Sequence, residues 1–356
     1  MSEKKETAPV LIRRRGRTMS VVLNRPQAVN SLDRRMVQLI REGLEEAERD
    51  PLVELVLLYG EGERGFCAGG DVKKMAHLVA QKKMEECLRF LEEEYQVDLS
   101  IHRFPKPVVV LADGITMGGG LGLGAGADVV VCTERTRSAM PETRIGFFPD
   151  VGATGWMFRK CPPGYPEYLG LTGYEMIGSE CVRVGLATHM ADSRAIPQIR
   201  AVLEKSRMDV SLERGKAAEG IVRLIEPFVR REIPSKPLMD DWVRNYFAGK
   251  TTVTGIVEGL RECSEFTDLC RDVFRELSER SPTSLVLTLN LLRMNEGRTI
   301  EDVLRTDLDA ARFILSHPDF LEGVRARLID KDDRPGWRPE RIEEAERLAC
   351  PLIGKT

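Results

Sequence analysis

Two carboxylic acids eight residues apart are the side chains best suited to chemistry in this chain. Glu142 and Asp150 lie within residues 140–152, a segment that is otherwise mostly apolar and is interrupted by proline and glycine. Carboxyl groups in apolar surroundings lose hydration, which raises their pKa and suits them to acid–base catalysis. Ordinary structural roles also stay open, because Glu142 follows Pro141 as an acid of a first helical turn does, and Asp150 is a common helix N-cap residue.

Two glycine-bearing segments, 66–71 and 114–120, form the second chemical feature. Their sequences are FCAGGD and GITMGGG, and each stands between a strand-like apolar run and a helix-like run. Backbone N–H groups at a helix start lack an intrahelical acceptor, so they bind developing negative charge with help from the helix dipole. Two such segments that converge would form an oxyanion hole. A phosphate cradle and simple tight turns are the alternatives, although neither segment fits GxxxxGKS/T or GxGxxG.

Composition and the motifs that are missing narrow the function class. The 356 residues are 42% hydrophobic, which is enough for a substantial core and excludes a wholly disordered chain. With 53 Lys and Arg against 56 Asp and Glu, the net charge is −3, so no polyanionic partner such as a nucleic acid is expected. The lack of GxSxG and HExxH removes support for serine hydrolases and zinc hydrolases.

The cysteines and the hydropathy pattern bear on the compartment. Eight cysteines are scattered without a CxxC pair, so we expect reduced thiols rather than a disulfide framework, and no zinc site. No run of ~18 apolar residues is present, and the first residues lack the apolar region of a secretory signal. We therefore expect a protein of the cytoplasm or an organelle matrix that does not enter a membrane.

The elements that would position these groups follow an α/β order. Apolar runs predict strands at 53–59, 107–112 and 129–132. Periodic segments predict helices at 32–49, with Asn30 or Ser31 as N-cap, and at 72–97. A further helix through about residue 127 would follow the second glycine segment. Strand, glycine loop, helix and strand in succession are typical of α/β folds. From about residue 195 the pattern is helical, with a helix capped at Ser281, so we expect two lobes divided near 195–205.

The N-terminal segment 10–24 predicts a strand pair or hairpin with an arginine-rich run at 13–17. A solvated hairpin turn is the favoured interpretation of this run. A nucleic-acid-binding patch is the alternative.

Taken together, the motifs resemble the crotonase (enoyl-CoA hydratase/isomerase) superfamily. More narrowly, the chain is similar to the 3-hydroxyisobutyryl-CoA hydrolase family. The resemblance spans about residues 10 to 340. It rests on FCAGGD at 66–71, GITMGGG at 114–120, AMPET at 139–143, GFFPDVG at 146–152, SPTSL at 281–285, DFLEGVRA at 319–326 and LIDKD at 328–332. The segment 152–156, with Trp156 at its end, departs from the glycine-rich run of the family and would reshape the acyl pocket.

The resemblance implies a fold and an oxyanion hole. It implies a spiral of ββα turns around a CoA thioester site at 10–200, followed by a helical extension at 201–345. It assigns the two oxyanion donors to the amides of Ala68 and Gly119. The same loops would contact the substrate through Gly69, Gly70, Asp71 and Gly118.

The resemblance also separates two reactions. Hydratases of the superfamily use two glutamates, of which one corresponds to Glu142 and the other to Gly122, which has no side chain. The hydrolase branch instead carries an aspartate where Asp150 stands and a glutamate that falls on Glu94. From composition alone Glu94 would be a surface acid of a helix.

The function expected from the resemblance is hydrolysis of a short 3-hydroxyacyl-CoA, foremost 3-hydroxyisobutyryl-CoA. No metal or redox cofactor is expected, because CoA enters as part of the substrate. Lys73 and Lys74 would either meet the CoA phosphates or form an exposed helix face. An enoyl-CoA hydratase or isomerase, and an inactive CoA- or RNA-binding relative, are the alternatives. Self-association as a homo-oligomer, such as the trimers of the superfamily, is also expected.

Overall fold

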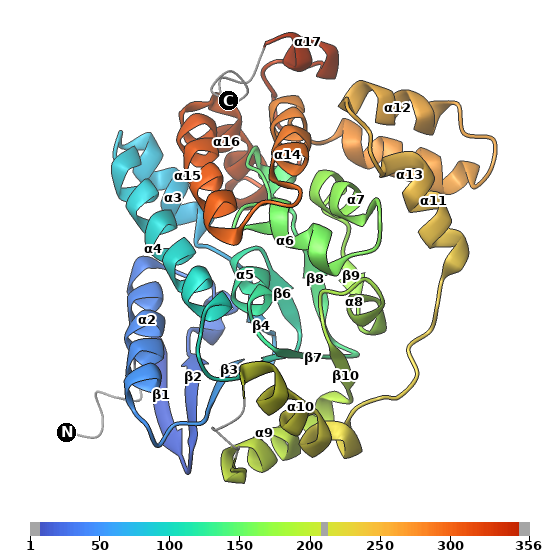
Figure 1. Ribbon diagram of the computed structural model, residues 1–356. Coiled ribbons are helices and arrows are strands. Elements are labelled where there is room, and N and C mark those ends of the chain that lie inside the picture. Colours follow the sequence, from blue (N-terminus) through green and yellow to red (C-terminus); the bar gives the residue numbers. More distant parts are fainter. Residues whose placement is uncertain (1–7, 208–212, 349–356) are drawn as a thin grey trace. The chain divides into compact units, whose positions relative to one another are not determined.

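The computed structural model describes residues 8–207 and 213–348 (Figure 1). Strands and helices alternate up to about residue 191, and the later described segments are helical. The mixed α/β fold with a helical C-terminal region is therefore confirmed. The chain forms two compact units, and neither is one continuous stretch. The first combines residues up to 70 with 93–138 and 175–235, and the second combines 71–92 and 139–174 with residues from 236 onward. This grouping differs from the division near residue 200 that the sequence suggested.

A six-stranded sheet forms the centre of the first unit. Its strands lie in the order β1 (Val10–Arg15), β2 (Thr18–Leu23), β3 (Leu55–Gly60), β5 (Val108–Ala112), β7 (Val129–Thr133) and β10 (His189–Ala191). The first two strands form the predicted antiparallel hairpin, and the other neighbours are parallel. The nearly continuous apolar runs of β3, β5 and β7 suit strands that are covered on both faces.

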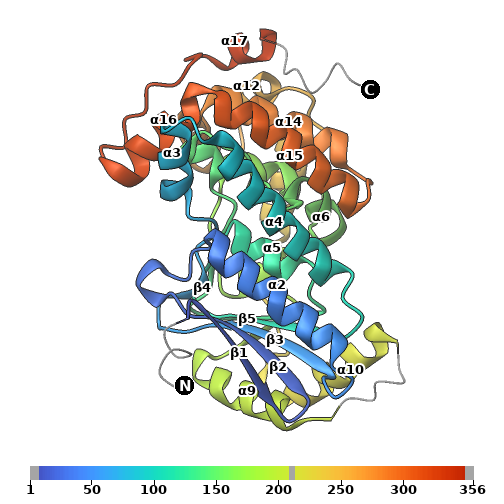
Figure 2. The same cartoon turned by 90° about the vertical axis from the view of Figure 1, so that its left-hand side faces the viewer.

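Helices cover both faces of this sheet (Figure 2). On one face lies α2 (Arg34–Arg49). Its Gly43 lies so close to the sheet that a Cβ added there would be only 3.3 Å from the Val21 side chain. On the other face α9 (Ile196–Lys205) and α10 (Arg214–Ile225) close a hydrophobic core with alternate residues of the same strands. The predicted N-cap of α2 was wrong: the cap is Asp33, whose carboxylate accepts from the Met36 N–H at 3.0 Å.

The arginine run is engaged by carboxylates of the first unit. Its ion pairs join Arg13 to Glu61, Arg14 to Asp50, Arg15 to Glu204 and Arg17 to Glu54, at 2.5 to 3.4 Å. Paired guanidinium groups on a two-stranded turn favour the hairpin interpretation over a nucleic-acid patch.

A second, small sheet supports the glycine segments. It comprises β4 (Gly65–Cys67), β6 (Ile115–Met117), β8 (Arg137–Ala139) and β9 (Met176–Ile177). Helix α5 (Gly119–Ala125) begins within the second glycine segment. The predicted helix at 72–97 is in fact two helices, α3 (Val72–Ala80) and α4 (Met84–His102). The chain turns between them at Lys82, whose φ is 60°.

The second unit is helical in its described part. Its C-terminal elements are α11 (Pro237–Phe247), α12 (Val253–Arg261), α13 (Thr267–Ser278), α14 (Pro282–Asn295), α15 (Ile300–Ser316), α16 (Pro318–Val324), the π-helical turn η5 (Arg325–Ile329) and α17 (Ile342–Arg347). The predicted cap at Ser281 is confirmed, because its hydroxyl accepts from the Ser284 N–H at 3.1 Å. Among the described helices, none is long and apolar enough to cross a membrane.

The cysteines correct one expectation. Cys263 and Cys270 form a disulfide, with Cα atoms 6.6 Å apart, so the prediction that the thiols are all reduced was wrong for this pair. The loop before α13 brings together two residues that lack the CxxC spacing. The other described cysteines, at 67, 87, 132, 161 and 181, are free thiols, and Cys350 lies outside the described residues.

Candidate active site

The two glycine segments lie side by side in the first unit. Strands β4 and β6 pair in parallel, so the loops that follow them leave the same edge of the small sheet. A Cβ built on Gly69 would meet Met117 O at 3.0 Å and Gly119 N at 3.3 Å. Gly69 also has a φ of +87°, a conformation that a side chain would strain. Glycine at this position therefore allows the close approach of the two loops.

Some backbone N–H groups of these loops already donate a hydrogen bond within the protein, and others do not. The Ala68 N–H donates to Val29 O at 3.0 Å, which contradicts the prediction that Ala68 supplies the first oxyanion donor. The Gly69 N–H is hydrogen-bonded to the Cys67 sulfur. Within residues 8–207 and 213–348, the N–H groups of Gly70 and Gly119 have no acceptor. Gly70 and Gly119 thus each leave a backbone N–H available to a ligand.

Glu94 is buried against the second glycine loop. Its side chain is 3% exposed, so the expectation of a surface helix acid, drawn from composition alone, was wrong. A Cβ added to Gly119 would overlap with the Glu94 carboxylate oxygen Oε1, so only glycine fits there while that carboxylate stays in place. Burial, together with the charges of Glu94 and Asp98, raises the pKa of the Cys67 thiol to about 12. The thiol beside these loops is therefore protonated and is not a nucleophile.

Glu142 opens a short 3-10 helix, η2 (Glu142–Ile145), in the second unit. It follows Pro141 as a first-turn acid and is nonetheless buried, with 8% of its surface exposed. The next residue, Thr143, is held twice: its carbonyl accepts from the Ser281 N–H at 3.3 Å, and its hydroxyl donates to Leu171 O at 3.0 Å. Helix η2 is therefore fixed by partners from α14 and α7 (Tyr165–Thr172).

Helix α16 supports the same segment through two glycines. A Cβ on Gly146 would overlap with Asp319 O, and a Cβ on Gly323 would overlap with the backbone of Ile145. The backbones of η2 and α16 are therefore in direct contact. The rings of Phe147 and Phe320 pack beside this contact, with centroids 5.7 Å apart.

Asp150 lies on a turn before α6 (Ala153–Lys160) and is 7% exposed. Its backbone carbonyl accepts from the Ala153 N–H at 2.9 Å. The N-cap of α6 is Gly152, and no side chain caps this helix. The alternative that Asp150 is an N-cap is therefore contradicted, and its burial needs another explanation.

The residues after the first glycine loop divide into a cap and a cavity lining. The carboxylate of Asp71 accepts from the Lys74 N–H at 3.3 Å and so caps α3. Lys73 lines a cavity of about 910 Å³ in the second unit, whereas Lys74 does not.

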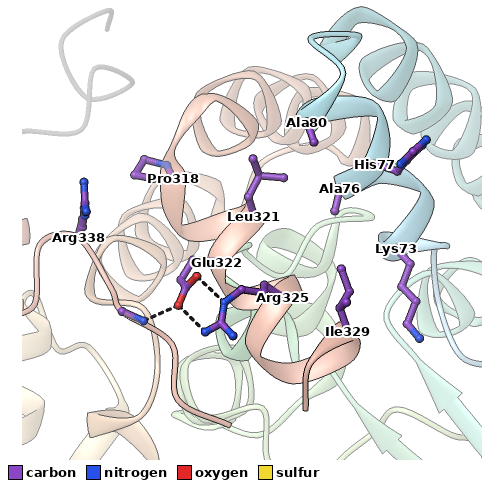
Figure 3. A pocket seen from close by; sticks show the side chains of 11 residues that line it. Lys73, Ala76, His77, Ala80, Pro318, Leu321, Glu322, Arg325, Ile329 and Arg338 are labelled. Carbon is purple, nitrogen blue, oxygen red and sulfur yellow. Dashed lines mark hydrogen bonds and ion pairs between the residues drawn. The ribbon is translucent and has the colours of Figure 1, made fainter. Parts of the chain in front are cut away.

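The lining of this cavity combines cations with apolar surface (Figure 3). Lys73 and Arg338 lie on opposite sides of it, and Leu321 and Ile329 supply apolar surface between them. Arg325 is neutralised by Glu322 through two hydrogen bonds of 2.8 and 2.9 Å. Such a lining suits a ligand with both anionic and apolar parts.

Some residues of these sites escaped the sequence analysis. Arg338 carries no recognisable signal, and Asp307, which contacts the Asp150 turn, lies in an ordinary amphipathic helix. Gly70 was expected to contact substrate rather than to donate its amide. The signal for Gly70 is only that two glycines follow Ala68.

Comparisons of sequence and structure relate this chain to known proteins. A family model described as enoyl-CoA hydratase/isomerase matches residues 18–350. The chain is 36% identical to a mitochondrial 3-hydroxyisobutyryl-CoA hydrolase of Rattus norvegicus, covering 97% of this chain and 88% of that protein. It is 33% identical to the Homo sapiens protein of the same name, covering 94% and 85%.

Two solved structures are similar over almost the whole chain. One is a carnitinyl-CoA dehydratase from Mycobacterium thermoresistibile, with TM-score 0.84, 33% identity and coverage of 96% of each chain. The other is an enoyl-CoA hydratase from Rhodobacter sphaeroides 2.4.1, with TM-score 0.83, 31% identity and coverage of 97% of each chain.

Proposed function

Because the chain belongs to the enoyl-CoA hydratase/isomerase family, we propose that it hydrolyses the thioester of a short 3-hydroxyacyl-CoA, foremost 3-hydroxyisobutyryl-CoA. The observation that carries this proposal is the likeness, over almost the full chain, to relatives named 3-hydroxyisobutyryl-CoA hydrolase. The buried carboxylic acids Glu142 and Asp150 support it, because both belong to the hydrolase pattern. The products are the free acid and CoA.

In the proposed reaction, backbone amides stabilise the charge on the thioester oxygen. The donors are the N–H groups of Gly70 and Gly119, because that of Ala68 is engaged. Loss of one such donor typically costs about 2.7–4 kcal/mol of transition-state stabilisation. No metal or redox group enters this scheme, since CoA is the leaving group.

Glu142 supplies the main catalytic carboxylate, by one of two routes. As a nucleophile it attacks the carbonyl carbon, CoA leaves as the thiolate, and water then hydrolyses the mixed anhydride to the acid and free Glu142. As a general base it removes a proton from the attacking water instead. Asp150 orients the 3-hydroxyl group or the water, and Glu94 shapes the floor of the acyl pocket.

Hydration of an enoyl-CoA is the second candidate, because the two similar solved structures are named a dehydratase and a hydratase. Position 122, where hydratases of the superfamily carry their second glutamate, is here a buried glycine of α5. A chain without that acid lacks one of the two groups that handle water in hydration. This difference favours hydrolysis.

Thiol release across an acyl-CoA panel tests the proposed function. The purified chain is incubated with 3-hydroxyisobutyryl-, 3-hydroxypropionyl- and crotonyl-CoA, and both free thiol and enoyl absorbance are followed. We expect thiol release from the two hydroxyacyl esters and no change in the crotonyl chromophore. Loss of the chromophore without thiol would establish hydration and reject the hydrolase proposal.

Lys73 is proposed to meet a phosphate of CoA from its place in the cavity. Lys73→Ala should raise KM for the acyl-CoA about five-fold, the effect of ~1 kcal/mol from an exposed charge pair, with kcat unchanged. Lys74→Ala is the matched control, because Lys74 is the neighbouring exposed lysine and does not line the cavity. Inhibition by pantetheine, which lacks the nucleotide phosphates, should be equal in both variants. An unchanged KM for Lys73→Ala would refute the phosphate role.

Compartment and assembly remain proposals. The relatives are named mitochondrial, and we propose that this chain acts in the cytoplasm or an organelle matrix. Self-association is also proposed, and light scattering of the purified protein measures it.

A further inference from the structure

The turn that carries Asp150 has a strained backbone. Val151 has a φ of 51°, in the left-handed region, and the next residue, Gly152, has a φ of 76°. A β-branched residue in this region is a genuine outlier, because its side chain crowds the backbone. Such strain persists only where the surrounding structure imposes the conformation.

Two hydrogen bonds impose this conformation from either side of the peptide. The Trp156 indole N–H donates to Val151 O at 3.0 Å. The Gly152 N–H donates to the carboxyl oxygen Oδ2 of Asp307 at 2.8 Å. Asp307 lies on α15. Ile300 of the same helix lies against the turn, because a Cβ added to Gly152 would be 2.5 Å from its Cδ1.

Thr154, in the first turn of α6, has polar contacts with two other helices. Asn295 donates through Nδ2 to the hydroxyl oxygen of Thr154 at 2.9 Å. The Thr154 hydroxyl also interacts with the Asp307 carboxyl and opposes the rise in its pKa. The first turn of α6 is thus bound to α14 through Asn295, and the N-cap residue Gly152 is bound to α15 through Asp307.

Burial disfavours the charged form of the Asp307 carboxyl. It is 0% exposed and has no ion-pair partner within the described part of the chain. Burial foremost, and the charge of Asp150, raise its pKa well above the ordinary value, against the opposing hydrogen bonds of Gly152 and Thr154. A neutral acid accepts from the Gly152 N–H as a carboxylate does, without the cost of an isolated buried charge.

We propose that Asp307 is a positioning residue that holds the strained turn of Asp150 in its working conformation. This inference rests on the proposed hydrolase function only for the role of Asp150. Asp307 itself does not touch the substrate and transfers no proton. An amide at this position would satisfy the Gly152 N–H equally well, because its oxygen accepts in the same place and it carries no charge.

Three substitutions test the proposal in the full chain. Asp307→Ala should lower kcat for thioester hydrolysis about 50-fold while KM stays within three-fold. Asp307→Asn should restore kcat to within three-fold of the wild type. Asp309→Ala, which removes an exposed acid of the same helix, is the control and should not change kcat. Near-UV circular dichroism checks that each variant is folded.

Amide hydrogen exchange gives a readout that does not depend on turnover. Exchange at Gly152 should be at least 30-fold faster in Asp307→Ala than in Asp307→Asn or the wild type. If Asp307→Ala does not fold, Thr154→Val replaces it in the test. We expect Thr154→Val to lower kcat about five-fold, and an unchanged kcat would overturn the proposal. Equal kcat and equal exchange in Asp307→Ala and Asp309→Ala would also overturn it, as would a folded but inactive Asp307→Asn. If the wild type releases no thiol, the hydrolase function is refuted instead. Hydrogen exchange at Gly152 then still tests the positioning role of Asp307.

Discussion

Replacing Glu142 by glutamine is expected to lower kcat for thioester hydrolysis by about 10³-fold, within the range typical of a lost acid–base or nucleophilic carboxylate. Glutamine has the same shape and can keep hydrogen bonds to its oxygen, but it is neither a base nor a nucleophile. Because Glu142 is only 8% exposed and begins the well-held helix η2, the substitution should leave the fold intact. KM should change little, and steady-state thiol release measures both constants.

The exposed acid Glu262 provides the matched control, since Glu262→Gln makes the same chemical change at the surface. If both variants turn over at the wild-type rate, Glu142 is not the catalytic carboxylate. Turnover of the wild type in heavy-oxygen water then separates the two routes. Label in Glu142 itself establishes a mixed anhydride that water opens at the Glu142 carbonyl, whereas a general base places label only in the product acid.

Replacing Gly146 by alanine is expected to destabilise the second unit by about 3 kcal/mol. Gly146 ends η2 with a φ of 70°, and an L-residue in that conformation costs roughly 1–2 kcal/mol. The added Cβ also overlaps with the backbone oxygen of Asp319, which cannot rotate away as a side chain can. Overpacking of this kind typically costs a further 1–3 kcal/mol. The shift of the urea unfolding midpoint measures the loss.

Gly297 separates the two contributions. It has a φ of +77°, yet nothing lies within 4 Å of the Cβ that alanine would add. Gly297→Ala should therefore show only the conformational cost, about 1 kcal/mol. Equal destabilisation by the two substitutions would mean that the contact between η2 and α16 adds no constraint.

Local sequence patterns were sufficient for much of the architecture. The hairpin at 10–24, the buried strands and the Ser281 cap follow from apolar periodicity and capping chemistry that act within a few residues. The same patterns failed at α2, where Asp33 rather than Asn30 or Ser31 takes the cap. They also missed the Cys263–Cys270 disulfide, because a loop rather than a motif brings those thiols together.

For the candidate site, too, sequence patterns identified some groups and missed others. The glycine loops and the two acids could be recognised from residue types and spacing, and the resemblance added Glu94. The amide of Ala68 could not be excluded in advance, because its acceptor, Val29 O, comes from a distant turn. Likewise the burial of Glu94 depends on its packing against Gly119 rather than on its acidic neighbours.

Residue types and their spacing along the chain therefore specified which groups can react: two acids and two glycine loops with amides at helix starts. The fold in space specified which amides remain available and how the acids are held. The bond from Gly152 to Asp307 joins residues 155 positions apart, and the contact of Gly146 with Asp319 is similarly remote. Such contacts depend on how helices pack, and no short stretch of sequence contains both partners.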